Sequence, residues 1–233
     1  MSAVVAADRG ARDLGPVRAH HALGISTGVF ADARGAWPDL VEAALGVSRD
    51  VVELSAMSYN ELPGLLSYLD GRTLPFRYVS VHAPVKGDRV YNVLSQLATL
   101  PLWVRSIVTH PDAIDSLPAH GQLTHRLVLE NMDDRKTYGR TADELAELFA
   151  ELPAAGFCLD VAHAWSVDPT MSSAHELLDA FRSRLRHVHV SSLRDGRHVT
   201  LRRADEELFT DVLARCRDVP WILEAPLREK ADF

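Results

Sequence analysis

Short apolar runs recur along the chain about every 30 residues, and most are separated by stretches with helical periodicity. Apolar runs bounded by polar residues are typical of buried parallel strands, and their alternation with amphipathic segments favours an α/β fold. Eight strands are expected, at 22–26, 51–54, 78–82, 106–110, 127–130, 157–160, 187–190 and 221–224. Helices are expected at 39–45, 60–69, 91–97, 142–152, 174–184 and 206–217. This pattern predicts an α/β (β/α)8 TIM barrel.

The alternation continues without a break in composition, so residues 19–233 are expected to form one domain behind a flexible extension at 1–18. Thr141 and Glu144 form a capping-box pattern that predicts a helix start. The connection 113–124 contains a proline and a glycine, so its helix should be short or broken. Only nine residues follow Glu224, too few for a full eighth outer helix. That flank should be uncovered unless the extension or a second subunit fills it, which is a motive for a homodimer.

Four polar residues at the ends of different predicted strands form the main candidate site: Glu130, Asp160, His189 and Glu224. In a parallel barrel these ends meet at the rim that carries the chemistry. One such residue alone is as readily a surface charge, but four buried, unpaired groups at one rim would be costly. Three carboxylates with one imidazole suit a Mn, Mg or Zn ion.

Further imidazoles lie close to the same predicted rim. His82 and His110 close adjacent strands and would hold a second metal that Glu130 bridges. His163 follows Asp160 by three residues and, with His198 and Asp195, would define a third site. A histidine at a strand end is often simply a satisfied core or rim residue, and that alternative stands for each of them taken singly.

Composition narrows the function. Lys and Arg number 25 against 32 Asp and Glu, and the net charge of −7 argues against nucleic acid as a partner. The two cysteines, Cys158 and Cys216, are isolated, so a reducing cytoplasm is expected. No stretch is apolar over the roughly 18 residues that span a bilayer, so no membrane is expected. The segment Met1–Arg18 lacks the apolar core of a secretory signal.

The order of these motifs resembles a known superfamily. His82-Ala83-Pro84, His110-Pro111, Glu130-Asn131, Asp160-Val161-Ala162-His163, His189-Val190-Ser191 and Glu224 are similar to the xylose isomerase-like barrels, which include endonuclease IV (AP endonuclease family 2) and the sugar and sugar-phosphate isomerases and epimerases. The resemblance spans the third to the eighth strand. It is specific for fold and metal, and weak for substrate.

The resemblance implies two mechanisms. The ketose epimerases hold one Mn or Mg with the positions matching Glu130, Asp160, His189 and Glu224, and the two glutamates transfer protons. Members similar to endonuclease IV add positions matching His82, His110, His163 and His198 and bind up to three zinc ions. This chain has the fuller set, although Asp195 lies three residues before His198 where that pattern has two.

The fuller set favours a multinuclear zinc hydrolase with two or three ions, acting on a small phosphoester or acyl substrate, with Glu130 as the bridge and Glu224 as ligand or base. The alternative is a one-metal isomerase or epimerase in which Glu130 and Glu224 are the proton-transferring pair. A non-catalytic binding barrel is the third hypothesis. The chain lacks a basic surface with long loops, so an abasic-site endonuclease is not expected.

Substrate contacts are expected from four residues near the same rim: Glu53, Lys86, Arg135 and Trp165. The two cations would meet an anionic small molecule, although surface charge is the commoner explanation for such residues. Glu53 would contact substrate or orient a ligand histidine. Trp165 would wall the site or merely pack. His187 shares a strand face with His189 and is interpreted as a core residue.

Overall fold

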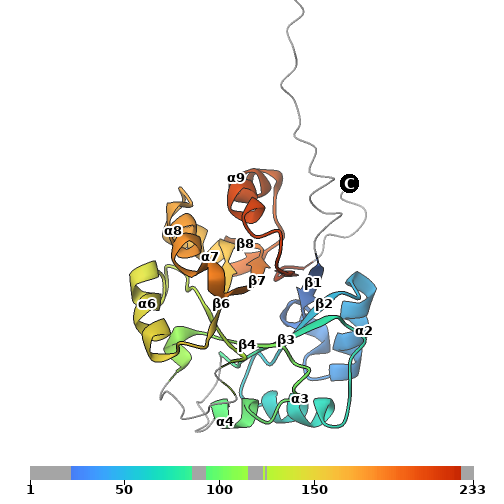
Figure 1. Cartoon of the computed structure of the whole chain (residues 1–233). Helices are drawn as coiled ribbons and strands as arrows, with labels where there is room; N and C mark the ends of the chain where they lie inside the picture. The colour runs from blue at the N-terminus through green and yellow to red at the C-terminus, as the bar shows by residue number, and fades with distance from the viewer. Residues whose placement is uncertain (1–21, 86–92, 115–122, 124, 227–233) are drawn as a thin grey trace, which may run out of the picture.

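The computed structural model describes residues 22–85, 93–114, 123 and 125–226. Eight parallel strands close into a barrel in the order β1-β10-β7-β6-β5-β4-β3-β2, and helices surround it (Figure 1). The barrel strands are β1 (Leu23–Ser26), β2 (Val51–Ser55), β3 (Tyr78–His82), β4 (Ser106–Thr109), β5 (Leu127–Glu130), β6 (Gly156–Asp160), β7 (Leu185–Val190) and β10 (Trp221–Leu223). The predicted TIM barrel is confirmed, and all eight strands lie where the apolar runs predict them.

The outer helices follow the predicted segments within a few residues. They are α2 (Trp37–Val47), α3 (Leu62–Leu69), α4 (Val93–Leu97), α6 (Ala142–Glu151), α8 (Ser172–Phe181) and α9 (Arg203–Ala214). Short 3-10 turns lie at η1 (Thr27–Val29), η2 (Ala31–Ala33), η3 (Pro111–Ala113) and η4 (Arg182–Arg184). The capping box is present, because the Thr141 side chain accepts from Glu144 N and the Glu144 side chain accepts from Thr141 N.

Two elements were not expected from the sequence. The helix α7 (Val161–Val167) begins directly after β6, with Asp160 as its N-cap. The strands β8 (Ser192–Arg194) and β9 (Arg197–Val199) form a separate antiparallel hairpin after β7. Its turn residues Asp195 and Gly196 have φ angles of 50° and 69°. Positive φ at both positions is the mark of a type I′ turn, for which Asp-Gly is a favoured pair.

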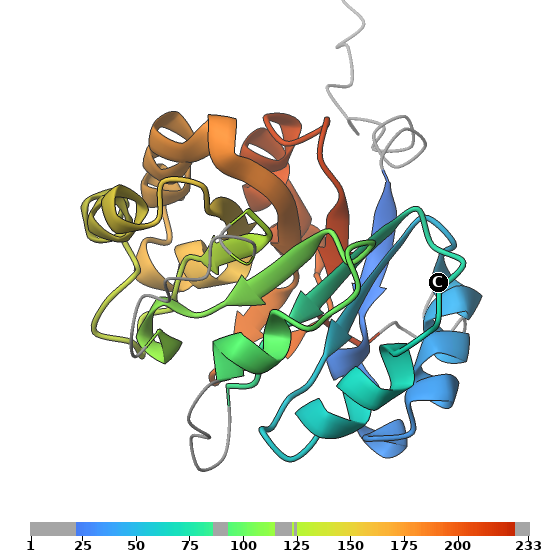
Figure 2. The same ribbon diagram turned by 60° about the horizontal axis from the view of Figure 1, so that its bottom comes forward.

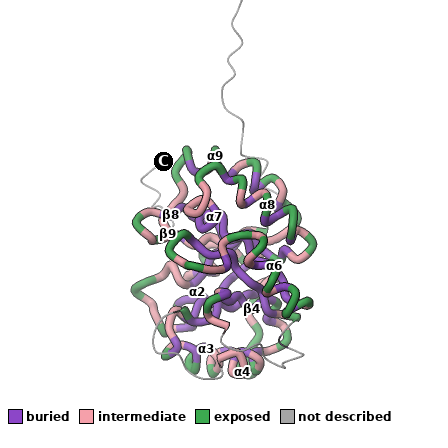
Figure 3. Tube along the Cα trace, turned by 90° about the vertical axis from the view of Figure 1, so that its left-hand side faces the viewer, coloured by how far each residue is buried: buried purple, intermediate pink, exposed green. Residues whose placement is uncertain are grey.

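The apolar core lies between the barrel wall and the helices. One cluster packs α6, α8 and α9 against β5, β6 and β7, and the other packs α2 and α3 against β1, β2 and β3. In Figure 2 the strands run through the middle with helices flanking them, and in Figure 3 the buried positions gather at the centre while exposed ones follow the outer helix faces. Because both faces of the strands are covered, they are apolar along most of their length.

Several predictions concern residues outside the described part of the chain. The extension at 1–18, the start of the predicted helix at 91–92, most of the 113–124 connection and the end of the chain at 227–233 all lie there. The uncovered eighth flank and the homodimer therefore stay predictions. Among the described residues, no helix is both long and apolar enough to cross a membrane.

Candidate metal centre

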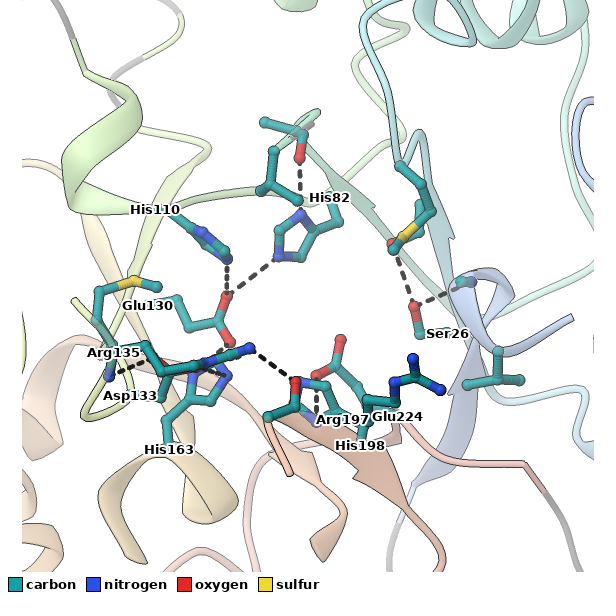
Figure 4. Close-up of a pocket in the computed structure, with 18 of the residues that line it drawn as sticks. Ser26, His82, His110, Glu130, Asp133, Arg135, His163, Arg197, His198 and Glu224 are labelled. Atoms are coloured by element: carbon teal, nitrogen blue, oxygen red, sulfur yellow. Dashed lines mark hydrogen bonds and ion pairs between the residues drawn. The ribbon is translucent and has the colours of Figure 1, made fainter. Parts of the chain in front are cut away.

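The predicted imidazoles and carboxylates meet at the carboxyl end of the barrel. His82, Glu130 and Asp160 are the last residues of β3, β5 and β6, while His110 and Glu224 directly follow β4 and β10. His189 is one residue from the end of β7. A cavity of about 410 Å³ opens above them and is lined by His82, His110, Glu130, His163, His198 and Glu224 (Figure 4). Asp160 and His189 are fully buried beneath this lining.

Glu130 lies at the centre of the site and is 1% exposed. Its Oε2 is 3.1 Å from His82 Nε2 and 3.3 Å from His110 Nε2. Its Oε1 is 3.2 Å from His189 Nδ1 and 3.4 Å from His163 Nδ1. Each oxygen of one carboxylate thus faces a different pair of histidines, as expected of a bridging ligand; Figure 4 shows the pair His82 and His110 beside Glu130.

Three overlapping groups of donors at the rim lie close enough to bind a cation, with ligand atoms within 4.8 Å of one another in each. The first comprises Glu130, Asp160, His189 and Glu224, hereafter the four-residue group. The second, the two-histidine group, comprises His82, His110 and Glu130. The third comprises Asp160, His163 and His198. These are the residues that the sequence assigned to the three sites, except that Asp195 belongs to no group.

The local structure around Asp160 fits a bound cation. Its Oδ1 accepts from the backbone N–H of His163 at 2.7 Å, as the N-cap of α7. Its backbone N–H donates to Asn131 Oδ1 at 2.8 Å, and its backbone carbonyl accepts from Asn131 Nδ2 at 3.0 Å. Its Oδ2 is buried and has no hydrogen-bond partner among the described residues. Since buried carboxylate oxygens are nearly always paired, this oxygen and the mixed N and O donor set both fit a divalent metal.

Burial and neighbouring charges shift the pKa values of the site residues in opposite directions. Burial would raise the pKa of Glu130, but His189, His110 and His82 outweigh it and hold that pKa well below its usual value. Burial would lower the pKa of His82, but the hydrogen bond and charge of Glu130 raise it to about 9. Burial and the neighbouring carboxylates raise the pKa of Glu224 to about 8 against the attraction of His189. Such opposed shifts in one cavity are typical of functional sites.

The residues proposed to contact substrate have different positions. Glu53 is fully buried below the cavity, where its Oε2 is 3.1 Å from His189 Nε2. Trp165 is not among the residues that line the cavity, and the Arg194 guanidinium lies over its ring at 5.0 Å. Lys86 lies outside the described residues. His187 is a buried core residue, as interpreted from the sequence.

Arg135 lines the cavity but is already engaged. Its guanidinium donates to the Asp133 carboxylate and, through Nη1, to the Gly196 carbonyl at 2.8 Å. Asp133 is buried and its Oδ2 lies 4.0 Å from His163 Nε2. Arg135 thus joins the loop after β5 to the β8–β9 hairpin, which carries His198. This is the position of a structural clamp beside the site.

Sequence reasoning missed several cavity residues. Ser26 ends β1 and Asp133 follows Glu130 by three residues, so the strand-end rule that found the histidines applies to both. Met57 and Arg197 also line the cavity. Arg197 lies on β9, and the Asp-Gly turn signal that precedes it would have revealed its strand.

Comparisons with known proteins agree with this architecture. The family model described as xylose isomerase-like TIM barrel matches residues 112–231. No curated protein sequence matches the chain. Among solved structures, endonuclease IV from Thermus thermophilus is similar with a TM-score of 0.55 and 19% identity, covering 90% of this chain and 94% of that one.

Two further structures are similar at lower identity. AP endonuclease family 2 from Brucella melitensis has a TM-score of 0.55 at 13% identity, with 88% of this chain and 92% of that one covered. D-psicose 3-epimerase from Clostridium cellulolyticum, with D-tagatose, has a TM-score of 0.54 at 15% identity, with 88% and 85% covered. At these identities the likeness establishes the fold and leaves the substrate open.

Proposed function

The chain belongs to the xylose isomerase-like TIM barrel family, and from that premise we propose that it is a divalent-metal-dependent hydrolase acting on a small phosphoester or acyl substrate. The imidazole-rich donor set favours zinc, with two or three ions at the rim. The observation that carries the proposal is Glu130, whose two oxygens face different histidine pairs in adjoining donor groups. A single-metal site would need neither His82 nor His110.

Each group of the site has a definite role in this proposal. Divalent cations, when bound, supply Lewis acidity that lowers the pKa of water and stabilises charge on a phosphoryl or acyl oxygen. Glu130 links the four-residue and two-histidine groups. Asp160 and His189 are fully buried, so they would hold a cation without contacting substrate. Glu130, Asp133 and Glu224 are the carboxylates that line the cavity, and Asp133 is already bonded by Arg135, which leaves Glu130 and Glu224 to meet a substrate. Glu224 is therefore the candidate ligand or base.

The size and charge of the cavity support a small anionic substrate. A volume of about 410 Å³ suits a small molecule. Three cations line it: Arg135, Lys136 and Arg197. Arg135 bonds Asp133 and Gly196, and Lys136 bonds Asp112 at 2.6 Å. Arg197, on the hairpin beside His198, is the best candidate to meet an anionic group of the substrate.

An isomerase or epimerase is the second candidate, and the four-residue group favours it. That group alone provides four donors for one Mn or Mg ion, and Glu130 and Glu224 both reach the cavity. An epimerase is also among the similar structures.

Elemental analysis of protein purified without added metal tests the proposal. Two or more zinc ions per chain support the hydrolase, and one Mn or Mg ion supports the isomerase. A chain without metal that also fails to bind added Zn²⁺, Mn²⁺ or Mg²⁺ would leave a binding barrel. The metal-loaded protein is then assayed on p-nitrophenyl phosphate and acetate, on ketoses by NMR, and on duplex DNA with an abasic site. Turnover of the DNA alone would overturn the assignment to small molecules.

A further inference from the structure

A fully buried carboxylate lies below the rim, inside the barrel. Glu53 is the third residue of β2 and pairs in register with Ser80 of β3, one layer below Ser55 and His82. Its Oε2 accepts a hydrogen bond from Ser80 Oγ at 2.9 Å and lies 3.1 Å from His189 Nε2. Glu53 is 0% exposed. An ionised carboxylate in such surroundings is costly unless a cation compensates it.

The described residues offer Glu53 no lysine or arginine partner. Its nearest imidazole nitrogens are His189 Nε2 at 3.1 Å and His187 Nε2 at 3.8 Å, and burial lowers the pKa of His187 to about 3, so His189 is the closer candidate to carry a compensating charge. His189 lies between Glu53 and the rim, because its other nitrogen, Nδ1, is 3.2 Å from Glu130 Oε1 and 3.4 Å from Glu224 Oε2. The imidazole therefore connects the buried carboxylate to the place where a cation would bind.

His82 provides a contrast within the same rim. Its Nε2 faces Glu130 at 3.1 Å, and its Nδ1 donates to the backbone carbonyl of Ala83 at 2.8 Å. A carboxylate behind a ligand histidine fixes its tautomer and makes the metal-facing nitrogen more basic than a neutral carbonyl does. His189 has the carboxylate, and His82 has the carbonyl.

We propose that Glu53 is a positioning residue that holds His189 with Nδ1 towards Glu130, Asp160 and Glu224, and so makes the four-residue group the tighter of two cation sites. The inference rests on the proposed metal centre. It assigns an order of filling: the four-residue group first, the two-histidine group second. Glu53 acts through His189 and does not touch substrate.

Titration of metal-stripped protein with Zn²⁺, followed by calorimetry and a competing chelator, tests this order. The wild type should show a tight and a weaker class of site. Glu53→Gln, which keeps the shape but removes the charge, should weaken the tight class about 10- to 100-fold. His110→Ala should remove the weaker class and leave the tight one. Tyr78→Phe is the matched control, because Tyr78 lies in the same interior and bonds His187 at 2.8 Å. It should leave both classes within about twofold.

Two measurements separate positioning from a general structural role. A structural lesion lowers the melting temperature with and without Zn²⁺ equally, whereas Glu53→Gln should reduce the Zn²⁺-induced rise itself. Long-range ¹H–¹⁵N NMR of the Zn²⁺-loaded wild type should show His189 protonated at Nε2, with its signal identified by its loss in His189→Gln. This second measurement does not depend on the folding of Glu53→Gln.

The failures are distinguishable. A wild type that binds no Zn²⁺, Mn²⁺ or Mg²⁺ overturns the proposed function and this inference with it. A wild type that binds Zn²⁺ normally, with the tight class of Glu53→Gln within twofold of it, overturns this inference alone. So does a His189 protonated at Nδ1 in the loaded protein.

Discussion

Replacing Arg135 with alanine should lower stability, because the guanidinium clamps two loops at the rim. Arg135 Nε donates to Asp133 Oδ2 at 2.9 Å, Nη2 donates to the same oxygen, and Nη1 donates to Gly196 O at 2.8 Å. The Asp133 side chain is 2% exposed, whereas that of Arg135 is 55% exposed. The variant leaves a buried carboxylate with the Arg135 backbone N–H at 3.0 Å as its hydrogen-bond donor.

The magnitude follows from these exposures. Removing one partner of a fully buried ion pair costs about 3–5 kcal/mol, whereas an exposed pair contributes about 0–1 kcal/mol. With one partner buried and one half in water, we expect about 2 kcal/mol. The lost bond to Gly196 adds about 1 kcal/mol. Arg135→Ala should therefore lower the free energy of unfolding by roughly 2–3 kcal/mol by these principles.

Urea unfolding of the metal-stripped protein measures this loss, with Asp133→Asn and the double variant completing a cycle. The coupling between Arg135 and Asp133 should exceed about 1 kcal/mol. Arg203→Ala is the control, because its pair with Glu207 is exposed and should be worth under about 0.5 kcal/mol. A loss below that limit for Arg135→Ala, together with a raised KM for an anionic substrate, would refute the clamp and support the substrate contact expected from the sequence.

The remaining predictions concern the bridge, the hairpin turn and an ion pair outside the site. Glu130→Gln should abolish activity and remove metal from both donor groups that share Glu130, whereas His110→Ala should remove metal from the two-histidine group alone. Elemental analysis of each variant measures the metal content. Full activity in Glu130→Gln would show that this carboxylate is not part of the site. Gly196→Ala should cost more stability in urea than Gly71→Ala. Both glycines have positive φ, but a Cβ at 196 meets Arg135 Nη1 at 2.5 Å and one at 71 meets nothing; equal losses would contradict the clash. The pKa of Asp205 is lowered because hydrogen bonds from Arg202 N and Arg194 outweigh its burial. The stability that ionised Asp205 contributes should be present above about pH 4 and lost as pH falls through its depressed folded-state pKa. Asp205→Asn should therefore cost about 1–3 kcal/mol at pH 7 and make unfolding free energy less dependent on pH in acid. The same acid dependence in wild type and variant would exclude this.

The barrel and its rim were predictable because each carries a strong local signal. Most positions of the wall strands are buried, so the strands contain short apolar runs such as Leu127–Leu129 in β5. Parallel strands bring their carboxyl ends to one edge, so a polar residue that closes a run, such as Glu130 or Asp160, must lie at the rim. The convergence of the four-residue and two-histidine groups therefore follows from the fold.

The sequence did not reveal how far below the rim a residue lies, or which side chains are already held by other bonds. For Glu53 the sequence left substrate contact and contact with a ligand histidine as equal alternatives. The second strand continues to Ser55, the register places Glu53 one layer below the rim, and there it contacts His189. The helix α7 after Asp160 was not predicted, because seven residues are too few for a clear helical period. Arg135 looks like any surface cation until the buried Asp133 beside it is known.

The β8–β9 hairpin shares no ladder hydrogen bonds with the barrel wall. The wall fixes the four-residue and two-histidine groups through its strand register, which cannot shift without unfolding the sheet. His198 instead lies on the hairpin, which Arg135 ties to the loop after β5 through its bond to Gly196 O at 2.8 Å. The third donor group therefore depends on the position of this hairpin as well as on the wall, whereas the other two depend on the strand register alone.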